Sequence, residues 1–261
     1  MVSSRVDTDL AHGGRWTSLR LGGREWLWSR DEPRRADVVP GDAFADAGGL
    51  EECVPTVRGT PDHGAAWARA WRRVDGADVV ECGDFVLYRR IRVSRTGVSA
   101  AYRLAASAGF RFVWAAHALL DVSPRAELVL SPGTAVRLYA DADSSYGVDV
   151  WPTAFRLDRL GPDDGTALGA VAVGVRTARV VDDGDHLELS LSAEADVPMS
   201  VAIWRNLGGF PAVAPYRSIG VEPMLGSVFD LAEAAVGDAV TVPPSGVVDW
   251  QLEITAGRTA A

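Results

Sequence analysis

The sequence predicts an all-β protein, a sandwich or barrel of antiparallel sheet with very little helix. Apolar and polar residues alternate strictly in HLELSLS (186–192) and in VVDWQLEIT (247–255), which is the period of strands with one buried face. Turns rich in glycine, proline and aspartate recur at intervals of about ten residues, as they do in sandwiches and barrels. Helical patterns are scarce, and the best candidate is VFDLAEAAV (228–236).

The other expected strands are apolar or alternating runs at 16–21, 85–93, 98–106, 110–117, 126–130, 134–139, 168–181 and 198–205. The turns between the strands include GG (22–23), RTG (95–97), SPG (131–133), GPDDG (161–165) and DDGD (182–185). Residues 29–47 are expected to form a long polar loop, and such loops in compact domains often border sites. No internal repeat or low-complexity linker divides the chain, so residues 1–261 are expected to fold as one domain.

Composition limits the classes of function. The net charge of -9 and the pI of about 5.0 argue against a nucleic-acid or anionic-membrane partner. All 26 basic residues are arginine, which excludes a lysine Schiff base and a phosphate-loop lysine. Cys53 and Cys82 have no zinc-finger spacing and are expected to be buried thiols. Without an apolar leader or membrane segment, a cytoplasmic location is expected.

A carboxylate in an apolar strand is the first candidate for chemistry. Glu222 lies within SIGVEPMLG (218–226), among apolar and small residues. A buried carboxylate is normally paired, protonated or functional because its desolvation is costly. Pairing with Arg217 is the structural alternative. Pro223 lacks an N–H for a sheet ladder, which favours a strand end or edge beside a cleft.

His117 is the second candidate. In FRFVWAAHALLDV, alternation places Phe112 and Trp114 on one face, which resembles a core, and His117 with small alanines on the other. That second face could border a groove. A core histidine hydrogen-bonded to the backbone is an equally good interpretation of the spacing alone.

His63 is the third candidate, in TPDHGAAWARAWRRV. A turn at Pro61–Gly64 precedes Trp67, Arg69 and Trp71, a composition that suits a sugar-binding lip. An edge strand with two core tryptophans is the alternative. His12 and His186 lie in polar surroundings and are expected to be solvated.

Several other chemistries lack their motifs. The chain has no GxSxG, no HExxH and no GxGxxG after a strand, and its histidine spacing favours no metal site. A carboxylate base and a histidine acid can move protons at neutral pH without metal or cofactor. We therefore expect no cofactor and no metal.

Four segments in order resemble the aldose 1-epimerase (galactose mutarotase) superfamily, nearest to its shorter bacterial branch of hexose-6-phosphate mutarotase-like proteins. They are GGLEECVPTV (48–57), PDHGAAWARAW (61–71), VWAAHALLDV (113–122) and SIGVEPMLG (218–226). The resemblance implies a large antiparallel β-sandwich, the galactose mutarotase-like supersandwich, with very little helix. It also implies interconversion of the α and β anomers of a free aldose by acid–base ring opening.

The same resemblance implies roles for the three candidates. Glu222 would take the proton of the anomeric hydroxyl, His117 would protonate the ring oxygen, and His63 would assist. The residues that would contact the sugar are Arg69, Trp67, Trp114, Glu51 and Asp149, the last as one candidate beside Asp121 for the sugar-binding aspartate. A phosphosugar would need convergent arginines, for which Arg72, Arg73 and Arg89 are available.

The function expected is therefore an aldose 1-epimerase with a small-molecule sugar as its partner, acting as a monomer or homodimer. A non-catalytic carbohydrate-binding or sensing protein on the same fold is one alternative. A related acid–base isomerase or lyase acting on a modified sugar is another.

Overall fold

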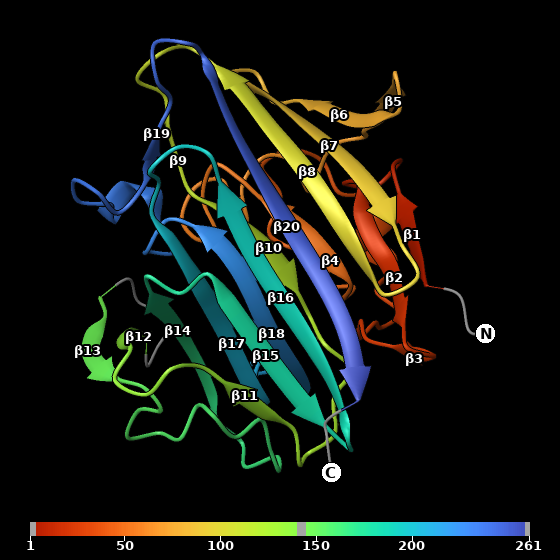
Figure 1. Ribbon diagram of the computed structural model, residues 1–261, viewed down its shortest axis with the longest axis vertical. Coiled ribbons are helices and arrows are strands. Elements are labelled where there is room, and N and C mark those ends of the chain that lie inside the picture. Colours follow the sequence, from red (N-terminus) through yellow and green to blue (C-terminus); the bar gives the residue numbers. More distant parts are fainter. Residues whose placement is uncertain (1–3, 140–144, 259–261) are drawn as a thin grey trace.

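Two large antiparallel sheets pack face to face in the computed structural model, which describes residues 4–139 and 145–258 (Figure 1). The ten-stranded sheet runs in the order β1 (Arg5–Asp9), β2 (Arg15–Leu21), β4 (Leu50–Cys53), β10 (Trp114–Ala118), β18 (Tyr216–Leu225), β17 (Met199–Phe210), β14 (Ala167–Val173), β12 (Ala135–Tyr139) and β13 (Gly147–Val150), with β3 (Arg24–Glu25) paired to β2. The predicted antiparallel β-sandwich is confirmed.

The second sheet has eight strands. Their order is β11 (Glu127–Val129), β15 (Thr177–Asp182), β16 (Asp185–Ala193), β20 (Val247–Arg258), β8 (Gly97–Ala106), β7 (Phe85–Val93), β6 (Ala77–Glu81) and β5 (Arg72–Val74). A small ladder joins β9 (Arg111–Phe112) to β19 (Val240–Thr241). Two 3-10 turns, η1 (Pro33–Ala36) and η2 (Leu231–Glu233), complete the elements. No helix within the described ranges is long and apolar enough to cross a membrane.

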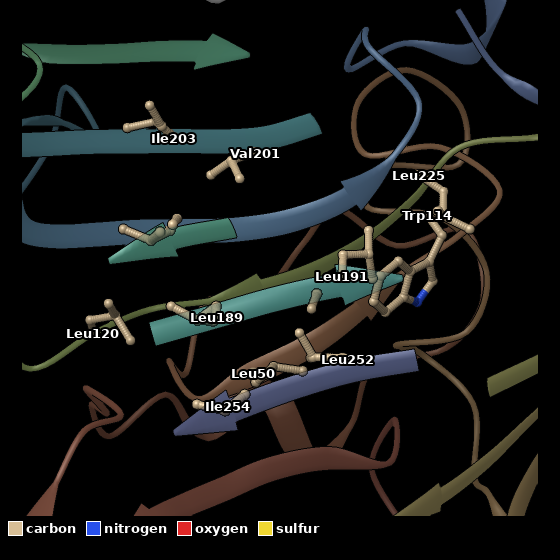
Figure 2. Packing of buried hydrophobic residues seen from close by; sticks show 14 of the residues in the cluster. Leu50, Trp114, Leu120, Leu189, Leu191, Val201, Ile203, Leu225, Leu252 and Ile254 are labelled. Carbon is tan, nitrogen blue, oxygen red and sulfur yellow. The ribbon is translucent and has the colours of Figure 1, made fainter. Parts of the chain in front are cut away.

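The main core lies between the two sheets. Leu189 and Leu191 of β16, with Leu252 and Ile254 of β20, project toward residues of the ten-stranded sheet such as Trp114 (Figure 2). The alternation predicted in 186–192 and 247–255 is thus confirmed, because the apolar side chains of both runs are buried together. This burial supplies most of the apolar contact that holds the sheets in place.

Two expected elements differ from the structure. The run 168–181 is two strands, because Gly174 with φ of 74° turns the chain between β14 and β15. The expected helix at 228–236 is only the short turn η2. The side chains of Val228 and Phe229 pack in an apolar cluster on a face of the sheet, so they do not form the apolar side of a helix. Gly237, with φ of 89°, lies just beyond the expected end of the helix.

The middle of the ten-stranded sheet is buried on both faces. Its outer face, turned away from the main core, carries a second apolar cluster that includes Cys53, Ala115, Met224 and Phe229. Cys53 and Cys82 are both buried and unbonded, as expected. The outer face therefore provides sheltered positions for polar side chains between these apolar neighbours.

Candidate active site

Strands β4, β10 and β18 are adjacent in the ten-stranded sheet (Figure 1), and each contributes one polar residue to its outer face. The β4–β10 register pairs Glu51 with His117. The β10–β18 register pairs Ala115 with Met224 and, four residues along, Leu119 with Gly220. The same register places His117, midway between them, opposite Glu222. Directly opposite residues in an antiparallel pair share a face. Glu51, His117 and Glu222 therefore form a row.

His117 and Glu222 are in direct contact. The imidazole Nδ1 lies 2.9 Å from Oε1 of Glu222, and the two side chains are only 9% and 3% exposed. The two groups form a close ion pair. The alternative that Glu222 pairs with Arg217 is wrong, because Arg217 contacts Asp163.

The Glu222 carboxylate depends on a glycine beneath it. A Cβ on Gly220 would lie 2.3 Å from Glu222 Oε1 and 3.1 Å from the Cβ of Trp204. A real side chain at this position would displace the carboxylate. The absence of a side chain at Gly220 thus allows Glu222 to fold back over its own strand toward His117.

Pro223 is in a central strand, so the expectation of a strand end or edge is wrong. Pro223 pairs with Val201 of β17 on one side. On the other side, the continuous β10–β18 ladder consists of the pairs Trp114–Leu225 and Ala115–Met224. The missing N–H is tolerated because this ladder stops beside Pro223, next to the His117–Glu222 contact.

Glu51 is held by arginine. Arg35 donates from Nε to Oε1 at 2.9 Å and from Nη2 to Oε2 at 3.1 Å, and Arg15 approaches to 3.9 Å. Burial raises the pKa of Glu51 to about 7, although Arg35 and Arg15 oppose this shift. Glu51 therefore supports the row from the β4 side and has no open face toward a ligand.

His63 lies over the same face from the loop that follows β4. Its ring centroid is 5.2 Å from that of His117, and its Nδ1 is 2.8 Å from Oδ1 of Asp62. Its backbone has φ of 55°, an uncommon value for a residue other than glycine. Burial lowers the pKa of His63, against the opposing effect of Asp62. The structure thus brings together the three residues singled out for catalysis.

The expected sugar contacts are less well placed. Trp114 is on the wrong face: it is fully buried in the main core, and its indole donates to Glu52. Asp149 is also misplaced, since it lies on the edge strand β13, beyond β17, β14 and β12 from Glu222, and caps the amides of Val150 and Ala154. Alternation had already placed Trp114 on the core-like face.

Trp67 and Arg69 flank the site without entering the row. Trp67 is 1% exposed and donates to the carbonyl of Asp62, so it supports the His63 loop from behind. Arg69 lines a separate surface hollow with Arg72 and Glu81. The buried Nε of Arg69 has no hydrogen-bond partner within the described ranges.

The three arginines considered for a phosphate do not converge on the row. Arg89 is buried in the sandwich interior against Glu52 and Asp78. Arg73 pairs with Asp78 and Arg72 with Glu81. All three arginines belong to the eight-stranded sheet, whereas the row lies on the outer face of the ten-stranded sheet. The arginines therefore cannot reach it.

Sequence reasoning missed several neighbours of the site. Tyr216 and Trp204 lie on the same face as Glu222, and Tyr216 donates to Asp46 Oδ2 at 2.6 Å. Tyr216 lies six residues before Glu222 in β18. Because alternate residues of a strand share a face, this spacing could have indicated Tyr216. Asp46 lies in the predicted polar loop 29–47 but was not singled out there, and it reaches the site because this loop crosses toward β18. In the described residues, no group of three or more His, Cys, Asp or Glu is arranged to hold a metal.

The ionisation of His117 gives a direct test of the contact. Burial lowers its pKa, but the Glu222 carboxylate outweighs burial and raises the pKa from 6.5 to about 9. We expect the imidazole to titrate near pH 9 by NMR. Because the folded pKa is raised, the stabilisation from this contact is present below pH 6.5 and is lost as pH rises through 9. A titration midpoint at or below 6.5 would contradict the ion pair.

Solved structures share this fold. A putative aldose 1-epimerase from Escherichia coli K12 is 13% identical with a TM-score of 0.73, covering 98% of this chain and 97% of its own. A putative mutarotase from Salmonella typhimurium is 17% identical with a TM-score of 0.62, covering 98% and 88%. Galactose 1-epimerase from Lactobacillus acidophilus is 11% identical with a TM-score of 0.61, covering 99% and 92%.

These likenesses show that the chain has the aldose 1-epimerase (galactose mutarotase) fold, as its four segments led us to expect. No family model and no curated protein matches the sequence. The chemistry of the site therefore has to be argued from its own residues.

Proposed function

We propose that this protein is an aldose 1-epimerase that interconverts the α and β anomers of a free aldose. The observation that carries the proposal is the contact of His117 with Glu222, on the sheltered outer face of the large sheet and beside His63. One acid and one base held together suit a substrate whose two reacting oxygens are attached to the same carbon.

In the proposed reaction, Glu222 takes the proton of the anomeric hydroxyl while His117 donates a proton to the ring oxygen. The C–O bond of the ring breaks, and the open-chain aldehyde rotates about its bond to the next carbon. Closure with the roles reversed returns both protons and delivers the other anomer. No redox step or group transfer is involved, and each positioned group contributes about 10²–10⁴-fold.

The electrostatics support these roles. Glu222 raises the pKa of His117 to about 9, so the imidazole carries its proton at neutral pH and can act as the acid. The pKa of His63 is lowered by burial, so His63 suits a neutral hydrogen-bonding role toward the sugar. Trp204, half-buried and opposite Gly220, offers an aromatic face next to Glu222.

A non-catalytic sugar-binding protein is the second candidate. The observation in its favour is the low exposure of the acid–base pair, with the Glu222 side chain only 3% accessible. Binding without turnover would need the same aromatic and hydrogen-bonding neighbours but no exposed base.

Anomer exchange followed by NMR separates the two candidates. We expect the protein to speed the approach of freshly dissolved α-aldoses to anomeric equilibrium, across a panel that includes neutral and phosphorylated sugars. Heat-inactivated protein is the control, since buffer components catalyse the same reaction. Saturable sugar binding without any faster exchange would overturn the epimerase proposal and support the binding protein.

A further inference from the structure

One aromatic side chain covers the two histidines of the site. The ring of Phe44 stacks on His63 with centroids 3.7 Å apart and an interplanar angle of 10°. The same ring approaches His117 edge-on at 5.6 Å. Phe44 therefore covers part of both imidazole rings beside the His117–Glu222 contact.

The segment that carries Phe44 is weakly held. Between residues 37 and 43 its hydrogen bonds are local, such as that from the Asp42 amide to the Val39 carbonyl, and most of these residues are exposed. Phe44 and Val38 are only partly buried, against a small cluster of Ala45, Trp67 and Ala68 that is separate from the main core. Segments with few buried contacts open at low free-energy cost.

Both ends of this segment are fixed to the body of the protein. Before it, Arg35 is bound to Glu51 and to the carbonyl of Trp67. After it, Asp46 accepts from the Tyr216 hydroxyl and caps the amide of Gly48. Any movement of the segment would therefore be confined to residues 37–45.

Among the residues that the structure describes, one hydrogen bond ties the segment to the site. The amide of Phe44 donates to Oδ2 of Asp62 at 3.0 Å, while Oδ1 of the same carboxylate contacts His63 Nδ1 at 2.8 Å. Beside the segment, a hollow of about 350 Å³ lined by Asp37, Val38 and neighbouring residues leaves space for movement.

We propose that residues 37–45 are a lid, that Phe44 determines access to His117 and Glu222, and that Asp62 is the latch that holds the lid closed. The identity of the entering ligand as a sugar rests on the proposed function; the lid itself does not. When the lid opens, a sugar ring takes the place of the Phe44 ring against His63.

Chemical labelling of His63 tests the lid without any assay of activity. In a His12→Asn, His186→Asn background, only His63 and His117 remain. Diethyl pyrocarbonate modifies neutral imidazole, and of the two only His63 has a lowered pKa. We expect Phe44→Ala to speed labelling of His63 at least about tenfold, because alanine removes the ring that covers the imidazole and so raises the accessible fraction.

Phe155→Ala is the matched control, because Phe155 is an exposed phenylalanine elsewhere on the surface; its labelling rate should equal that of the background. Equal rates in Phe44→Ala and the background would overturn the lid while leaving the proposed function intact. If anomer exchange is absent but labelling responds to Phe44→Ala, the role of Phe44 in access to His63 stands and the proposed function fails.

Hydrogen exchange of the unmutated chain provides a second test, independent of how well the variant folds. Peptides spanning residues 37–45 are expected to exchange well before β10 and β18. Asp62→Ala should speed exchange at Phe44 further, because it removes the acceptor of the Phe44 amide. Exchange of 37–45 as slow as that of β18 would refute the proposal.

Discussion

Glu222→Gln is expected to reduce the catalysed rate of anomer exchange by about 10²–10⁴-fold, the usual contribution of one positioned base. Glutamine preserves the shape that fits over Gly220, but it cannot accept the proton of the anomeric hydroxyl. The change also removes the negative charge that keeps His117 protonated, so the His117 pKa should fall. Rates measured by NMR from a single anomer provide the test.

Matched controls separate the site from the rest of the chain. Glu188→Gln alters a glutamate paired with Arg179 on the other sheet and should leave the exchange rate unchanged. His117→Asn should lose most of the rate, whereas His186→Asn, on β16, should not. Full activity in both Glu222→Gln and His117→Asn would exclude this pair as the catalytic groups.

Arg89→Met is expected to cost about 3–5 kcal/mol of unfolding free energy, the usual effect of removing one partner of a buried ion pair. Arg89 is fully buried and donates to Glu52 at 2.9 Å and to the carbonyl of Gly14 at 2.7 Å. Methionine fills much of the same volume but leaves the carboxylate of Glu52 without its counter-charge. Urea denaturation monitored by tryptophan fluorescence measures the loss.

The large loss expected for Arg89→Met follows from the hydrogen-bond network around the Glu52 carboxylate. Its two oxygens also accept from the Tyr102 hydroxyl at 2.9 Å and the Trp114 indole at 2.8 Å, inside the sandwich. Arg179→Met, which breaks the exposed pair with Glu188, should cost less than about 1 kcal/mol. Similar losses in the two variants would show that the Arg89–Glu52 pair adds no more than a surface pair.

The fold was largely predictable because strand alternation is a local property. The runs at 85–93 and 98–106 correspond to β7 and β8, whose apolar residues such as Leu87 and Leu104 are buried. Strand β4 was not identified from the sequence. It is buried on both faces, and its residues LEEC do not alternate between apolar and polar. Its glutamates face opposite sides of the sheet, Glu51 toward the site and Glu52 toward the core.

The candidate site was predictable only in part. Alternation put His117 on the face opposite Trp114, and apolar flanks marked Glu222 as unusual; both features survive in the structure. The assignments of Trp114 and Asp149 as sugar contacts failed. For Trp114 the local pattern already gave the right face. For Asp149 the position depends on strand order, which residues near it in sequence do not encode.

By itself the sequence determined the strand pattern, the acidic and lysine-free composition, and the face that each side chain of an alternating strand presents. Only the tertiary structure decided that His117 meets Glu222, that Asp46 reaches Tyr216 and that Phe44 covers the histidines. The physical reason is that alternation sets the face of a residue, whereas its neighbour depends on the order and register of strands distant in sequence. A shift of one residue between β10 and β18 would turn Glu222 or His117 to the other face and separate the pair.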